Sequence, residues 1–104
     1  MADVDVFSAL ANPVRRKLLE SLRAGPRAAG ELAGEFELSR PAVSEHLAVL
    51  RNARLVREEP RGRHRYYHLE PGPLAAVEEW LHPFERYWRA RMRSLHRLLD
   101  EEGS

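Results

Sequence analysis

The sequence feature that most constrains the fold is a pair of short helical patterns separated by about three residues. The first pattern covers roughly residues 28–36, and the second lies within LSRPAVSEHLAVL, residues 38–50. In the second, Val43, Leu47 and Leu50 recur at the spacing of one helix face and predict a buried stripe. Two helices joined by a tight turn, the second polar in its N-terminal half, form the helix-turn-helix pattern.

The other side of the second helix carries a mixed polar group. Ser39 stands where an N-cap residue is expected, because its side-chain oxygen can accept from an unpaired amide of the first turn. Arginine and glutamate on a helix can bond to base edges, arginine to guanine and glutamate to cytosine. The group therefore has the character of a surface that reads hydrogen-bonding edges, and its members are Arg40, Pro41, Ser44 and Glu45, with His46 at the boundary.

Two more helices precede this pair. Asn12-Pro13 is a typical helix start, with asparagine as N-cap and proline at the first helical position. From there Val14 to Leu22 repeats at helical spacing until Gly25-Pro26 ends the pattern. The earlier segment DVFSALA predicts a short helix with Phe7 and Leu10 facing inward.

A β-hairpin is predicted after the helix pair. A strand starts at Leu55 and Val56, residues 60–62 form a turn, and RHRYYHLE returns with Tyr67 and Leu69 on its inner face. Polar tips are ordinary in hairpins, but this tip is almost wholly cationic. We therefore predict that it contacts phosphates through Arg61, Arg63, His64 and Arg65.

The segment PGP, residues 71–73, opens a last helix of roughly 30 residues that His82-Pro83 should kink or restart. Its apolar residues recur every three or four positions, interrupted by Arg91, and form more apolar surface than a 70-residue head can cover. A second copy of the chain is the simplest partner for that surplus. The expected dimer interface comprises Phe7, Leu74, Val77, Leu81, Phe84, Trp88, Leu95 and Leu98.

Composition narrows the function classes. The chain has 104 residues, enough for one domain, with residues 1–70 as a head whose wing is 55–69 and residues 71–104 as a dimerisation helix. The net charge is only +1, yet six arginines lie between Arg51 and His68. Cysteine is absent, which excludes disulfides and thiolate chemistry. No secretion signal or run of roughly 18 apolar residues is present, so we expect a cytoplasmic protein.

An enzyme is not expected, because no glycine-rich phosphate loop is present and Ser44 and His46 cannot face each other on a helix. The order of elements predicts a mainly α fold with a small β-hairpin, a winged helix-turn-helix with a long C-terminal helix. The segments FSALANPVRRKLLESL, ELAGEFELSRPAVSEHLAVLRNARLV and GRHRYYHLEPGPLAAVEEWL resemble the arsenic-repressor-like (ArsR/SmtB-type) family of bacterial transcriptional regulators, over residues 5–99.

The resemblance implies a homodimeric repressor that binds double-stranded DNA at a palindromic operator. Arg40, Pro41, Ser44 and Glu45 would then face the major groove, and His46 and Arg51 would lie close to the DNA backbone. Ser39, at the start of this recognition helix, belongs to the same expected DNA-binding set. No particular small-molecule effector is implied. A different class of function stays open, in which the wing and helix face dock an acidic protein partner, as the carboxylate of Glu45 favours.

The chain departs from the family pattern at several positions. The family usually has glycine at the positions of Glu37 and Arg54, and both positions should need a left-handed backbone. Its cysteine-bearing metal site is replaced here by ELAGEF, without a thiolate. Of the four metal positions on the terminal helices, His82 and His96 match, whereas Trp80 and Arg93 do not. We therefore expect a branch without metal or other cofactor, with a metal-responsive repressor using His82 and His96 as the alternative.

Overall fold

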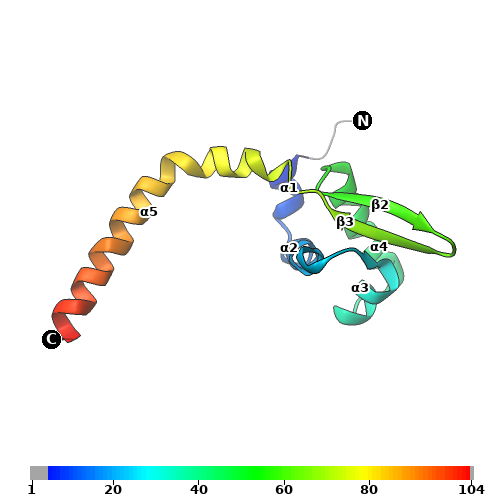
Figure 1. Cartoon of the computed structure of the whole chain (residues 1–104), viewed down its shortest axis with the longest axis horizontal. Coiled ribbons are helices and arrows are strands. Elements are labelled where there is room, and N and C mark those ends of the chain that lie inside the picture. The colour runs from blue at the N-terminus through cyan, green and yellow to red at the C-terminus, as the bar shows by residue number, and fades with distance from the viewer. Residues whose placement is uncertain (1–4, 104) are drawn as a thin grey trace.

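The computed structural model describes residues 5–103 and confirms a mainly helical fold with a small antiparallel sheet (Figure 1). A one-turn 3₁₀ helix, η1, follows the second α-helix. In chain order the elements are α1 (Val6–Leu10), α2 (Pro13–Ser21), η1 (Leu22–Ala24), β1 (Arg27–Ala28), α3 (Ala29–Glu35), α4 (Arg40–Asn52), β2 (Val56–Arg61), β3 (His64–Leu69) and α5 (Leu74–Gly103).

The predicted N-caps are confirmed at the starts of α2 and α4. The side-chain oxygen of Asn12 accepts from the amides of Val14 and Arg15 at 2.8 and 3.1 Å. The hydroxyl of Ser39 accepts from the amide of Ala42 at 3.2 Å. Proline occupies the first turn of both helices, where a missing N–H costs nothing. Helices α2 and α4 therefore begin where local sequence chemistry sets them.

The core lies where the head helices meet the inner face of the hairpin. The predicted stripe of α4 is confirmed, since Val43, Leu47 and Leu50 are fully buried, and β3 adds Tyr67. The expectation for α1 was wrong at Phe7, which is 40% exposed, whereas Val6 and Ala9 are buried. The reason is tertiary: α1 presents Phe7 to α5 rather than to the head's interior.

Both predicted left-handed positions are confirmed, with φ of 54° at Glu37 and 63° at Arg54. Each ends a helix in the same way. The amide of the third residue beyond the helix donates back to a carbonyl of the last turn, Leu38 to Ala33 and Leu55 to Leu50, both at 2.9 Å. A non-glycine residue in this conformation costs about 1–2 kcal/mol.

The sheet has the order β1-β3-β2, and β2 pairs with β3 from Val56 opposite Leu69 to Arg61 opposite His64. The predicted turn at residues 60–62 was wrong by about two residues, since Pro60 lies within β2 and Gly62, with φ of 59°, turns the chain. Proline is tolerated there because β2 is an edge strand. The two-residue strand β1, which pairs with β3, was not predicted.

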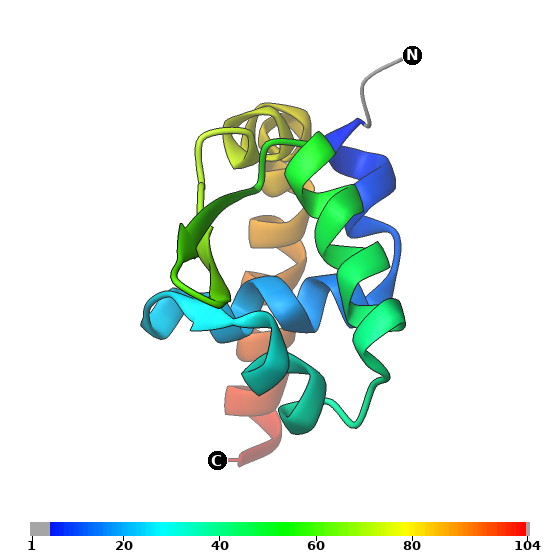
Figure 2. The ribbon, with the colours of Figure 1, turned by 90° about the vertical axis from the view of Figure 1, so that its right-hand side faces the viewer.

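Helix α5 runs continuously over 30 residues with Pro83 inside it. It changes direction in the part that contains Pro83 (Figures 1 and 2), and its distal half extends away from the head (Figure 1). Leu74 and Val77, at its start, pack against the core of the head. None of the helices in the described part of the chain combines the length and apolarity that crossing a bilayer requires.

Candidate nucleic-acid interface

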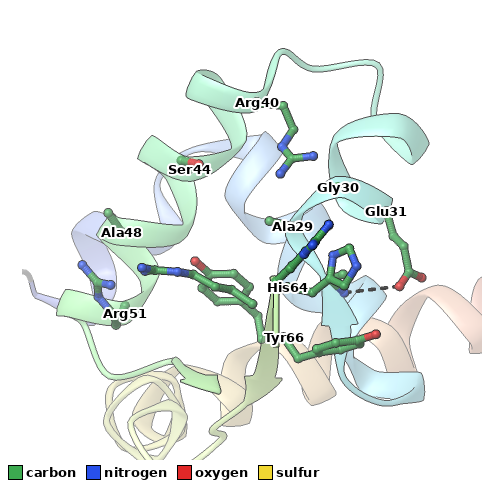
Figure 3. A pocket seen from close by; sticks show the side chains of 13 residues that line it. Ala29, Gly30, Glu31, Arg40, Ser44, Ala48, Arg51, His64 and Tyr66 are labelled. Atoms are coloured by element: carbon green, nitrogen blue, oxygen red, sulfur yellow. Dashed lines mark hydrogen bonds between the residues drawn. The ribbon is translucent and has the colours of Figure 1, made fainter. Parts of the chain in front are cut away.

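A cleft of 750 Å³ lies between the start of α3, one face of α4 and the wing, the hairpin of β2 and β3 (Figure 3). Its walls bring together residues that are up to 39 positions apart in the sequence, from 28 to 67. Basic side chains from two elements line it: Arg40 and Arg51 from α4, and Arg63, His64 and Arg65 from the wing. Glu31 is the acidic residue among those that line it.

The α4 wall of the cleft follows one helix face. Arg40, Ser44, Ala48 and Arg51 recur every three or four residues and line it together (Figure 3). The guanidinium of Arg40 reaches across to the start of α3, where its Nη1 would lie 2.9 Å from a Cβ at Gly30. Glycine at position 30 thus leaves room for this orientation of Arg40.

The remaining residues predicted on α4 lie outside the cleft. Pro41 and Glu45 are exposed beside it, and Ser39 caps the helix. His46 is half-buried, and its Nδ1 is buried without a hydrogen-bond partner within the described residues. The predicted reading group is therefore divided between the cleft wall, the adjoining exposed face of α4 and the edge of the core.

Glu58, which sequence reasoning missed, joins the wing to the end of α4. One carboxylate oxygen accepts from Nη1 of Arg51 at 2.7 Å, and the other accepts from Nη1 of Arg65 at 2.5 Å. The Glu58 side chain is only 14% exposed. Burial raises the pKa of the neighbouring Tyr67 hydroxyl, and the negative charge of Glu58 raises it further. Both basic partners lie seven positions away, so no local motif announces the bridge.

The outer face of the wing has its own charge network. Arg61 pairs with Glu59 at 2.7 Å and lies over the ring of Tyr66, 4.8 Å from its centroid. A hydrogen bond from His68 Nε2, at 3.0 Å, is the main cause that lowers the pKa of the Glu59 carboxyl, and Arg61 adds to it. Arg61 is therefore held on the outer face and does not line the cleft.

Arg63 and His64 occupy the tip of the hairpin and are exposed. Within the described residues Arg63 makes no ion pair, whereas Arg61 and Arg65 each pair with a glutamate of β2. Of the wing arginines predicted to contact phosphate, Arg63 is thus the one that can do so without giving up an internal partner.

A second cleft, beside the bend of α5, contains His82, one of the two histidines of the metal alternative. The side chain of His82 is 81% exposed, and its Nδ1 lies 3.9 Å from Glu85. Arg86, Arg89 and Arg93 line the same cleft. Three guanidinium groups supply no lone pair and repel a cation, so this donor set does not fit zinc. No group of three or more His, Cys, Asp or Glu side chains is positioned to hold a metal within residues 5–101.

Helix α5 carries a large exposed apolar surface from Trp80 to Leu99. Trp80 packs edge-on against Phe7 of α1, with ring centroids 6.0 Å apart, and tilts against Phe84 at 5.1 Å. Leu74 and Val77, predicted as interface residues, are half-buried against the head. The predicted interface residues that stay exposed are Phe7, Leu81, Phe84, Trp88, Leu95 and Leu98.

Comparisons with known proteins agree with this geometry. The sequence profile described as "Bacterial regulatory protein, arsR family" matches residues 12–58. The HTH-type transcriptional regulator Rv2034 of Mycobacterium tuberculosis is 45% identical over 97 residues, which cover 93% of this chain and 88% of that protein. The transcriptional repressor SdpR of Bacillus subtilis is 35% identical, over 74% of this chain and 86% of that repressor.

The solved structures to which the chain is similar are also described as transcriptional regulators. The crystal structure of the ArsR family transcriptional regulator RHA00566 superposes with a TM-score of 0.70 and 36% identity, over 80% of this chain and 86% of that one. The crystal structure of a possible transcriptional regulator for arsenical resistance gives 0.69 and 38%, over 85% and 86%. These relatives are regulators rather than enzymes.

Proposed function

The chain belongs to the ArsR family of bacterial regulatory proteins and is a winged helix-turn-helix transcriptional regulator, and from that premise we propose that it is a homodimeric repressor of a palindromic operator. In this proposal α4 enters the major groove and the wing follows the adjoining backbone. Arg40, Ser44 and Glu45 read base edges. The phosphate contacts come from Arg51, Arg63, His64 and Arg65.

The observation that carries the proposal is the basic cleft. Helix α4, the recognition helix of this proposal, and the wing together bring four arginines and His64 to one cleft, although the net charge of the whole chain is only +1. A local concentration of guanidinium groups in a chain whose net charge is close to zero favours a polyanion over a neutral ligand. The exposed N-terminal half of α4 beside the cleft adds the side chains that sequence readout needs.

The apolar face of α5 supports the dimer. Trp88, Leu95 and Leu98 are each about half exposed or more, on a helix segment that leaves its own head. Covering this face with the same face of a second copy generates a two-fold axis. Two recognition helices related by that axis bind two inverted half-sites, which is why a palindrome is expected.

The test is selection of DNA by the purified full-length protein from a pool of random duplexes. We expect an inverted repeat whose half-sites are about one helical turn apart. Affinity for the selected duplex should fall steeply between two salt concentrations, because phosphate contacts release counterions. Recovery of no preferred sequence, together with binding to an acidic polypeptide, would instead favour the protein-docking function.

A further inference from the structure

Glu58 lies where the wing meets the end of the recognition helix, and its two oxygens bind guanidinium groups from different elements. Arg51 belongs to the last turn of α4, and Arg65 belongs to β3. One carboxylate thus ties together the two parts of the molecule that would approach DNA. Since the carboxylate is only 14% exposed, solvent and salt screen these ion pairs less than an open surface pair.

Building on the proposed DNA-binding function, we propose that Glu58 is a positioning residue for operator recognition, which fixes the wing against α4 and restrains the guanidinium groups of Arg51 and Arg65. A phosphate contact carries no sequence information, because every duplex presents the same backbone. Free arginines on a loose wing would therefore strengthen binding to any DNA. While Glu58 holds them, the guanidinium groups of Arg51 and Arg65 reach the DNA backbone only when α4 is aligned with the base edges.

Glu59, the next residue of β2, supplies a matched control. It carries the same charge but lies on the opposite face of the hairpin. Its partners are Arg61, two residues along the same strand, and His68 on the paired strand. Replacing Glu59 thus removes one negative charge from the wing without loosening the wing from α4.

The experiment compares E58Q and E59Q, which are nearly isosteric and change the net charge equally. Each variant and the wild type are titrated with the duplex selected by the wild type and with a shuffled duplex of the same composition. For E58Q we expect the ratio of the two affinities to fall about tenfold, mainly through tighter binding of shuffled DNA. For E59Q both affinities should rise together and the ratio should stay within about twofold of the wild-type value. An equal ratio in the two variants would overturn the assignment.

A second readout needs no DNA. Backbone ¹⁵N relaxation of residues 61–65 should show an ordered wing in the wild type and in E59Q, with order parameters of about 0.85 that fall below about 0.6 in E58Q. Unchanged order in E58Q would overturn the bridging role. If the wild type fails to discriminate the two duplexes, the proposed function fails, and relaxation still decides whether Glu58 holds the wing.

Arg51→Gln keeps the test open should E58Q not fold. The Arg51 side chain is 48% exposed, so its replacement disturbs no core packing but removes the partner of Glu58 on α4. We expect the same loss of order at the tip of the hairpin in this variant. A wing that stays ordered without Arg51 would count against the bridge.

Discussion

Replacement of Trp88 by alanine tests whether α5 forms the dimer. Trp88 is 64% exposed in the isolated chain. A tryptophan buries about 150–250 Å² when enclosed, so covering the 64% removes roughly 100–160 Å² from water. At about 25 cal/mol per Å² this contributes roughly 2.5–4 kcal/mol for each subunit. Since 1.4 kcal/mol is a factor of ten, we expect the dimer dissociation constant to rise at least about a hundredfold.

Sedimentation equilibrium over a concentration series measures this dissociation constant. Arg97→Ala is the control, because residue 97 lies on the opposite face of α5 by helical periodicity, and its dimer should match the wild type. Operator affinity should fall together with dimerisation in Trp88→Ala, because two half-sites must be engaged at once. An unchanged dimer, or tight operator binding by monomers at micromolar concentration, would refute the reasoning.

Three further outcomes follow from the same geometry. Arg63→Ala should flatten the log–log salt dependence of DNA binding by about 1.8 per dimer, at about 0.9 for each lost phosphate contact, and Arg61→Ala by less, because Arg61 is already held within the hairpin. Anisotropy titrations at several salt concentrations measure both slopes, and an unchanged Arg63→Ala slope would remove the wing tip from the DNA backbone. Arg40→Ala should relax specificity by about 1–3 kcal/mol at one base pair, measured on operators altered one pair at a time, whereas uniform weakening would exclude base readout. Zinc, nickel and cobalt should leave operator affinity unchanged, and a tenfold loss with metal that disappears in the His82→Ala, His96→Ala double variant would contradict this.

The sequence by itself determined the elements whose causes are local. Asn12 and Ser39 cap α2 and α4 because each side-chain oxygen accepts from backbone amides that lie at most three residues further along the chain. The buried face of α4 follows from the 3.6-residue period, which needs no knowledge of what covers it. The left-handed backbone at Glu37 and Arg54 follows from the family pattern, and the structure has it at both positions.

Features that depend on distant parts of the chain were decided only by the tertiary structure. Strand β1 exists because β3 offers it an edge, and Pro60 is accepted inside β2 because that strand has one side unpaired. Phe7 points away from the interior of the head because its ring packs against Trp80 of α5. The sequence does not distinguish Glu58 from an ordinary exposed strand residue, because its two guanidinium partners are set by the pairing of β3 with β2 and by the packing of α4 against the wing. Periodicity reports which face of an element is apolar, whereas the partners of a charged side chain are set by which elements the fold brings together.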